Sequence, residues 1–137
     1  MSALFTFELH TPYRPFFIGR VESILLTLSD GEIGVYANHS AFTAPCLSCI
    51  IRFKDDKGCD RLAFITEGIL EVKEHKTVLM VDSAEWPEEV DPDRARVAKQ
   101  QAEENLKTAS LKFEVDHVKA RLRRAEYRLK AWGLRNK

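Results

Sequence analysis

The sequence predicts an α+β fold, with an N-terminal antiparallel β-sandwich or flattened barrel followed by a C-terminal two-helix antiparallel hairpin. Before residue 84, apolar residues recur in period two and are interrupted by Gly, Pro and Asp, as in short antiparallel strands. After residue 91 they recur every three or four positions, and Pro92 and Gly133 are the only Pro and Gly. The chain therefore divides into a sandwich over 1–84, a linker over 85–90 and a helical hairpin over 91–137.

The first half supplies eight or more short strands. In the first, Phe5, Phe7 and Leu9 alternate with polar residues. The further strand candidates cover residues 16–19, 21–28, 32–36, 44–53 (a pair divided at Pro45), 60–66, 69–72 and 77–82. The turns Ser29-Asp30-Gly31 and Asp55-Asp56-Lys57-Gly58 offer a glycine for positive φ. Short strands at this spacing indicate a sandwich or barrel.

The second half predicts two helices. Asp91 suits the N-cap of the first helix and Pro92 its first helical position. The stripe of the first helix consists of Ala95, Ala98, Ala102, Leu106 and Ala109, and that of the second of Val115, Val118, Leu122, Ala125, Leu129 and Trp132. A break is expected around Ser110 to Glu114, and Gly133 ends the second helix. An alanine-rich seam buries little apolar area, so we expect a hairpin of low intrinsic stability.

Composition and charge argue against a nucleic-acid-binding protein and against a protein that spans a membrane. The 21 basic and 21 acidic residues cancel, which argues against nucleic acid as a partner. No apolar run reaches the ~20 residues of a membrane helix, and the N-terminus lacks a secretory signal. We therefore expect a cytoplasmic protein, or one on the cytosolic face of a membrane without direct insertion.

The three cysteines could in principle bind a metal ion or act as reactive thiols. Cys46 and Cys49 have CxxC spacing, which could ligate zinc or exchange disulfides. No second CxxC or His pair completes a tetrahedral site, so we expect Cys46, Cys49 and Cys59 to be buried or bystander thiols, with no metal site. A thiol enzyme that uses Cys46 and Cys49 stays open as an alternative.

One stretch resembles a known family. Gly31-Glu32-Ile33-Gly34-Val35-Tyr36-Ala37-Asn38-His39-Ser40-Ala41-Phe42 is similar to the Gly-Glu-(Leu/Ile)-Gly-(Ile/Val)-x-Pro-Gly-His-x-Pro-(Leu/Phe) signature of the epsilon subunit of bacterial F-type ATP synthases. Residues 68–72 resemble that family's Gly-Gly-x-Leu-Glu-Val strand, and 77–85 resemble its next strand and the exit from the sandwich. The match is collinear over essentially the whole chain. Ala37-Asn38 replaces Pro-Gly, Ala41 replaces a Pro, and Glu67 replaces the first Gly of the pair.

The resemblance implies a non-catalytic rotor subunit without catalytic residues of its own. It would couple the gamma subunit to the c-ring during ion-driven ATP synthesis, as a peripheral protein on the cytoplasmic face of the bacterial plasma membrane. Glu32 and His39 would contact the c-ring loops or gamma. An extended hairpin would present a basic face, formed by Arg121, Arg123 and Arg124, to the beta and alpha subunits and inhibit ATP hydrolysis.

Some bacterial members of this family bind ATP through an (Ile/Leu)-Asp-x-x-Arg-Ala motif, which residues 90–95 resemble. The ATP-binding residues that the resemblance implies are Glu85, Asp91, Arg94, Ala95, Arg124 and Arg128. Arg121, Arg124 and Arg128 share one helix face and could clamp phosphates bidentately. Gln101, at a position that is often basic in the family, is expected to weaken phosphate binding. No Walker-type loop is present, so we expect no hydrolysis by this chain and no required cofactor.

Two alternatives stay open beside a regulatory ATP site. Asp91 could be only an N-cap, and the arginines could form a solvated or subunit-facing stripe. The chain could also be a helical-hairpin transcription factor that acts in an RNA polymerase channel. Such factors carry paired acids at the hairpin tip to hold Mg²⁺, whereas the tip near 108–113 offers Lys107 and Lys112 and no acid pair.

Overall fold

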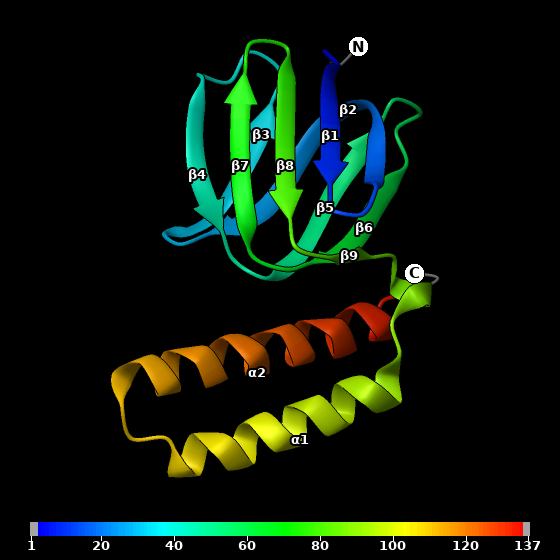
Figure 1. Cartoon of the computed structure of the whole chain (residues 1–137). Coiled ribbons are helices and arrows are strands. Elements are labelled where there is room, and N and C mark those ends of the chain that lie inside the picture. Colours follow the sequence, from blue (N-terminus) through cyan, green and yellow to red (C-terminus); the bar gives the residue numbers. More distant parts are fainter. Residues whose placement is uncertain (1–2, 136–137) are drawn as a thin grey trace. The chain divides into compact units, whose positions relative to one another are not determined.

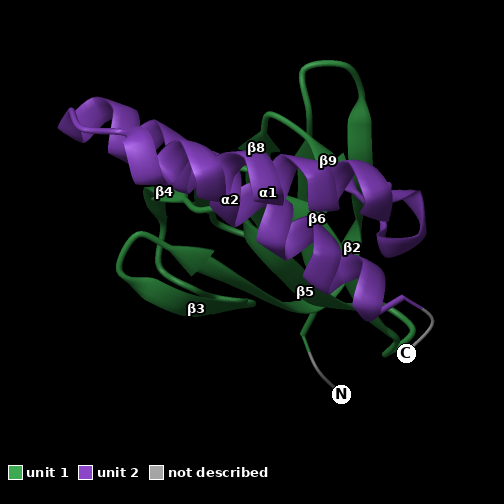
Figure 2. Cartoon of the chain, turned by 90° about the horizontal axis from the view of Figure 1, so that it is seen from below, with its two compact units in different colours: residues 1–84 green, residues 85–137 purple. Residues whose placement is uncertain are grey.

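The computed structural model describes residues 3–135 and divides into two compact units, residues 1–84 and 85–137 (Figure 2). Among the described residues, no helix combines the length and apolar character needed to cross a membrane. The strands of the first unit are β1 (Phe5–His10), β2 (Pro15–Leu28), β3 (Gly31–Tyr36), β4 (Phe42–Cys46), β5 (Cys49–Asp55), β6 (Asp60–Ile65), β7 (Gly68–Lys73) and β8 (Lys76–Val81) (Figure 1). The short β9 (Ala84–Glu85) spans the boundary between the units.

The strands of the first unit form one sheet that closes on itself. Their order is β1-β8-β7-β4-β2-β5-β6, and β3 pairs with β2. β1 also pairs with β2, in antiparallel register, while its pairing with β8 is parallel. The closing contact between β2 and β4 is a single residue pair, Leu28 with Cys46. This is the flattened barrel of the predicted fold class, which the structure confirms.

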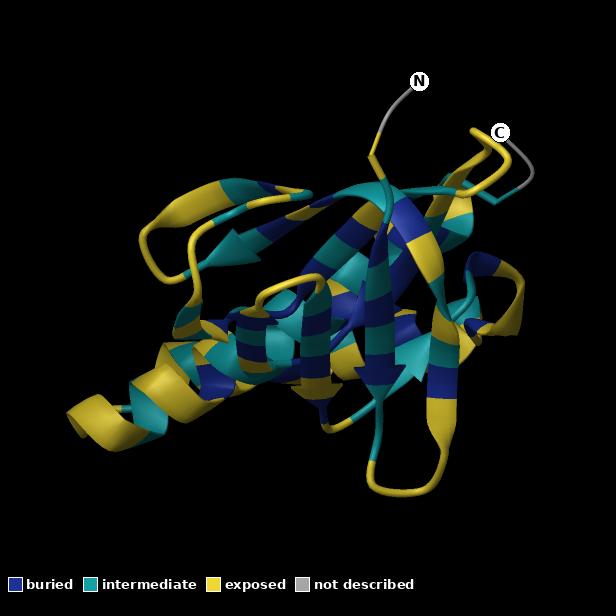
Figure 3. Ribbon diagram, turned by 90° about the horizontal axis from the view of Figure 1, so that it is seen from above, coloured by how far each residue is buried: buried dark blue, intermediate teal, exposed yellow. Residues whose placement is uncertain are grey.

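Alternation of apolar and polar residues builds the core of this unit. Phe5, Phe7 and Leu9 are buried as predicted, with exposed fractions of 3% or less. Buried bands alternate with more exposed ones along the strands (Figure 3). The rings of Phe7, Phe17 and Phe53 pack together, with centroids 4.7–5.8 Å apart, distances at which aromatic pairs attract.

Two strand predictions need correction. The separate candidates over 16–19 and 21–28 are one 14-residue strand, β2, which pairs with β1 over its first half and with β3 over its second. Pro45 does not divide a strand pair: it lies inside β4, opposite Ile69, and the break falls after Cys46. Proline is found at such positions when one edge of a strand is largely unpaired, and β4 pairs along its length only with β7, while its other edge makes the single pair of Leu28 with Cys46.

The turns depend on a few special backbone positions. Gly31 has φ of 125° and Gly58 has φ of 76°, as their turns require. Asn38, which replaces a glycine of the family signature, adopts a left-handed conformation with φ of 68°. Asn38 and His75 are the only non-glycine residues with positive φ in the described part of the chain, so Glu67 occupies its position without backbone strain.

The second unit contains a short 3₁₀ helix, η1 (Pro87–Glu89), and two α-helices, α1 (Pro92–Thr108) and α2 (Lys112–Gly133). The Asp91 carboxylate accepts a hydrogen bond from the Arg94 N–H at 3.1 Å, so the predicted N-cap is confirmed. The predicted break around Ser110 to Glu114 is present, but it is shorter and begins one residue earlier, because residues 109–111 lie between the helices. A three-residue connection is typical of an antiparallel helical hairpin.

The seam between the two helices is narrower than predicted. Ala95 and Ala102 of α1 and Val118 and Ala125 of α2 are buried, but Ala98 is exposed. The two helices run antiparallel and lie side by side (Figure 1). Because methyl groups fill little space, the alanines leave room between the helices, and that room forms the candidate site.

Candidate functional site

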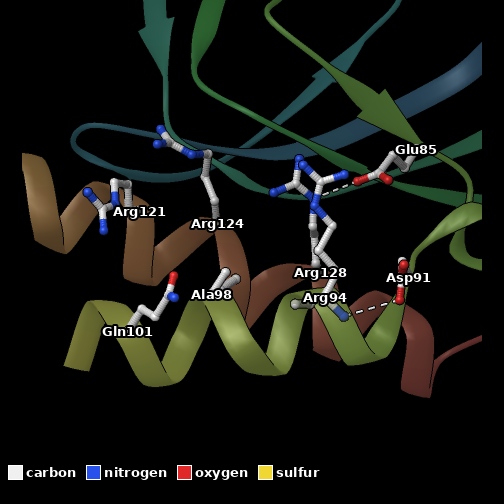
Figure 4. A pocket seen from close by; sticks show the side chains of 10 residues that line it. Glu85, Asp91, Arg94, Ala98, Gln101, Arg121, Arg124 and Arg128 are labelled. Carbon is white, nitrogen blue, oxygen red and sulfur yellow. Dashed lines mark hydrogen bonds and ion pairs between the residues drawn. The ribbon is translucent and has the colours of Figure 1, made fainter. Parts of the chain in front are cut away.

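The second unit contains a cavity of about 480 Å³ between α1, α2 and the segment that precedes α1 (Figure 4). This volume lies in the range of small-molecule sites. The lining residues are Glu85, Asp91, Arg94, Ala95, Ala98, Gln101, Arg121, Arg124, Ala125 and Arg128. All six residues predicted to bind ATP are among them, so residues more than 40 positions apart in the sequence line one cavity.

Helical periodicity explains this convergence. Arg121, Arg124 and Arg128 follow each other at i, i+3 and i+7 on α2, which places their side chains on one face. On α1, Arg94, Ala98 and Gln101 follow the same rule. Three alanines, at positions 95, 98 and 125, line the cavity between these polar groups and keep it open.

Electrostatics make the cavity cationic. Its lining includes four arginines and two carboxylates, an excess of two positive charges. Arg128 Nε donates to Glu85 Oε1 at 2.6 Å, and the side chains of Arg128 and Glu85 are 31% and 26% exposed. The second carboxylate, Asp91, accepts from the N–H of residue 94. Guanidinium groups in this number favour a ligand with several negative oxygens, such as a polyphosphate.

The predicted inhibitory face is split by the structure. Arg121 and Arg124 line the cavity, whereas Arg123 lies over the ring of Tyr127, with its guanidinium carbon 4.7 Å from the ring centroid. A stacked guanidinium at this distance is a cation–π contact. In the folded hairpin these arginines therefore occupy two different environments.

Glu32 and His39 lie near opposite ends of β3. Glu32 is the exposed second residue of the strand, and roughly 13 Å of strand separates it from Tyr36 at the other end. His39 follows in the next loop, where its Nδ1 lies 3.1 Å from the Ser40 carbonyl oxygen and its ring packs on Phe42. A partner that touches both must extend along the length of β3.

Cys46, Cys49 and Cys59 form no disulfide bonds. Cys46 and Cys49 are buried and Cys59 is exposed. Burial raises the pKa of the Cys46 thiol to about 11, with a further contribution from Cys49, so very little thiolate forms at neutral pH. A thiol enzyme requires the opposite shift. Among residues 3–135, no group of three or more His, Cys, Asp or Glu side chains could hold a metal ion.

Sequence reasoning missed the role of two lining residues, Ala98 and Ala125. Both were assigned to the seam between the helices, because a small apolar residue at helical spacing normally packs against a neighbour. The signal that could have found them is that Ala98 on α1 and Ala125 on α2 both lie on the helix faces that also carry the arginines.

Comparison with known proteins supports both units. Residues 4–87 match the beta-sandwich domain of the family described as ATP synthase, Delta/Epsilon chain, and residues 88–133 match its long alpha-helix domain. The chain is 40% identical over 131 residues to the ATP synthase epsilon chain of Caldanaerobacter subterraneus subsp. tengcongensis, covering 95% of this chain and 94% of the relative. It is 43% identical over 128 residues to that of Caldicellulosiruptor bescii, covering 93% of each.

Solved structures share the fold at lower identity. A chain in the Euglena gracilis mitochondrial ATP synthase (OSCP/F1/c-ring) gives a TM-score of 0.81 at 19% identity, covering 96% of this chain and 82% of that one. A chain in the Tetrahymena thermophila mitochondrial ATP synthase (central stalk and c-ring) gives 0.64 at 16% identity, covering 92% and 94%.

Proposed function

The chain belongs to the ATP synthase delta/epsilon chain family, and from this premise we propose that it couples gamma to the c-ring and regulates ATP hydrolysis through its helical hairpin. It is an epsilon-type, non-catalytic subunit of the central stalk and a peripheral part of a membrane-associated complex. The first unit docks on gamma and on the polar loops of the c-ring, and Glu32 and His39 contribute to that surface. Glu32 is exposed on β3 and His39 lies half-buried in the loop that follows the strand, so both can be reached by a partner that lies along β3.

The hairpin binds ATP as a regulatory ligand. The observation that carries this proposal is the cavity in which Glu85, Asp91, Arg94, Arg124 and Arg128 come together. Guanidinium groups bind phosphate oxygens through paired, charge-assisted N–H donors. The carboxylates can accept hydrogen bonds from the amino group of adenine. ATP thus supplies negative charge and hydrogen-bonding groups to a cationic cavity, without being hydrolysed there.

Ligand binding would bias the conformation of the hairpin. The cavity takes residues from both helices, so only a hairpin with α1 and α2 side by side can hold the ligand completely. A ligand that binds one state stabilises it by RT ln(1 + [L]/Kd) relative to a state that does not bind. In the absence of ATP, the hairpin opens and extends along gamma. Arg121, Arg123 and Arg124 then contact acidic segments of the beta subunit, and ATP hydrolysis is inhibited.

Calorimetric titration of the isolated full chain with MgATP tests the nucleotide site. We expect saturable binding by the unmodified chain and loss of at least 100-fold in affinity for the Asp91→Ala/Arg124→Ala double variant. Arg96→Gln is the matched control, because Arg96 lies on α1, pairs with Asp93 at 2.6 Å and does not line the cavity. Circular dichroism checks that α1 persists without its cap. If the double variant and the control bind MgATP with equal affinity, Asp91 is only a helix-capping residue and the proposed nucleotide site is refuted.

A further inference from the structure

One edge of β3 is open in the part of the chain that the structure describes. Within residues 3–135, β3 pairs with β2 alone, whereas β1, β5, β6, β7 and β8 each lie between two neighbouring strands. The open edge runs along the margin of the first unit (Figure 2). Proteins commonly protect such an edge with proline, lysine or a β-bulge. β3 contains neither of these residues, and its register with β2 runs without a shift from Gly31 to Tyr36.

The register with β2 shows which backbone groups of β3 face this edge. Leu28 and Gly31 pair directly across the turn at residues 29–30. Such a closing pair is hydrogen-bonded, and bonded and non-bonded pairs alternate along an antiparallel ladder. Gly31, Ile33 and Val35 therefore bond to β2. The residues that alternate with them direct their backbone groups toward the open edge.

Glu32, Gly34 and Tyr36 are the residues whose N–H and C=O groups point away from β2. The Tyr36 carbonyl agrees with this alternation, because it accepts a hydrogen bond from the His39 N–H at 3.3 Å in the following loop. Glu32 and Tyr36 are exposed, and Gly34 between them has no side chain that could obstruct a neighbouring backbone. An extended strand that approaches this edge meets a regular row of donors and acceptors.

This row is complementary to a second copy of itself. When two β3 strands meet antiparallel with Gly34 opposite Gly34, each Glu32 lies opposite the Tyr36 of the second copy. Up to about six backbone hydrogen bonds then join the copies. Each carboxylate faces a phenol hydroxyl that can donate to it, and no like charges lie directly opposite. A register shifted by two residues places the two Glu32 side chains diagonally next to each other and pairs fewer residues, so charge favours the register centred on Gly34.

We propose that the free chain forms a symmetric dimer through antiparallel pairing of two β3 strands, centred on Gly34. The dimer closes after two copies, because each copy uses its open β3 edge once, and it protects that edge from uncontrolled strand pairing. A single strand pair is smaller than a standard protein interface, so we expect a weak dimer with a Kd of about 10 µM to 1 mM. Because the dimer covers the strand that carries Glu32, it excludes docking through this surface and belongs to the chain before assembly.

Sedimentation equilibrium of the full-length chain, from micromolar to millimolar concentration, measures the dimer. Gly34→Pro should weaken it at least about 10-fold, because proline removes the N–H of the central pair, and proline is tolerated where an edge strand faces solvent. Tyr36→Glu should weaken it about 5- to 50-fold, because two pairs of carboxylates then lie opposite each other. Tyr13→Glu is the matched control, since Tyr13 is 91% exposed and lies outside β3, and it should leave the Kd unchanged. Circular dichroism checks that the variants are folded.

A charge swap tests the register independently. Adding Glu32→Lys to Tyr36→Glu should restore most of the lost affinity, because lysine then faces glutamate across the dimer at both pairs. In the unmodified chain, hydrogen exchange of the Glu32, Gly34 and Tyr36 amides should slow as concentration rises, whereas the Ile33 amide, already bonded to β2, should not change. A chain that stays monomeric up to about 1 mM would overturn the proposal. So would a dimer that Tyr36→Glu and Tyr13→Glu weaken equally, or one that the charge swap does not restore.

Discussion

Gly68 occupies a position where a single methyl group should damage the docking unit. A Cβ built on Gly68 would lie 2.0 Å from the carbonyl oxygen of Met80 and 2.7 Å from a methyl carbon of Val81. Separations under 3.0 Å are not tolerated, and the nearest atom is backbone, so β7 and β8 must move apart by about 1 Å. That displacement acts on the residue pairs Gly68–Val81 and Ile69–Met80, which end the β7–β8 ladder.

We expect Gly68→Ala to lower the free energy of unfolding of the first unit by about 1–3 kcal/mol, the usual cost of forcing extra volume into a packed position. For a unit of this size, this corresponds to a decrease in Tm of roughly 5–20 °C. Gly34→Ala is the matched control, because the three atoms nearest to its Cβ would belong to the side chain of Tyr36, which is 56% exposed and free to turn aside. Urea and thermal unfolding, followed by circular dichroism, measure both variants. Midpoints of Gly68→Ala equal to those of Gly34→Ala would refute the steric argument.

Two further predictions concern function and thiol accessibility. A chain that lacks residues 91–137 should still fold as a β-sandwich and bind gamma, and the detached catalytic head that contains it should hydrolyse ATP faster. Hydrolysis rates equal to those of the full-length assembly would show that the hairpin is not inhibitory. Iodoacetamide at pH 8 should modify Cys59 rapidly in the folded chain, whereas Cys46 and Cys49 should react only in urea, because both are buried and the pKa of Cys46 is raised to about 11. Mass spectrometry counts the modified thiols, and rapid modification of all three in the folded chain would contradict the buried assignment.

Local physical rules made several features predictable. The Asp91 cap, the proline that follows it and the glycine turn at position 31 depend on backbone groups within four residues, which a sequence displays directly. The left-handed Asn38 belongs to the same class, since asparagine tolerates that conformation better than most residues. The alternating strands were predictable because one face of each lies against a core.

Other features depend on tertiary contacts that the sequence does not display. Pro45 was expected to break a strand, and it is accommodated only because one edge of β4 lacks a continuous partner. The arginine row of α2 could be predicted from helical spacing, but its division between the cavity and the Tyr127 ring could not. Ala98 lines a cavity rather than a packed seam, and helical spacing alone does not show which of the two a small residue will face.

The parallel pairing of β1 with β8 has a consequence for synthesis of the chain. Thr6 pairs with Lys76 and His10 with Met80, so about 70 residues must leave the ribosome before the first strand finds this neighbour. At a synthesis rate of about 5–20 residues per second, several seconds or longer pass between the emergence of β1 and that of β8. During this time only β2 can pair with β1 and cover its apolar side chains. Contacts this distant in sequence also slow folding, whereas the hairpin of α1 and α2 forms from neighbouring segments. The β-sandwich, rather than the helical hairpin, should therefore limit the rate of maturation and be the part that most needs protection from aggregation.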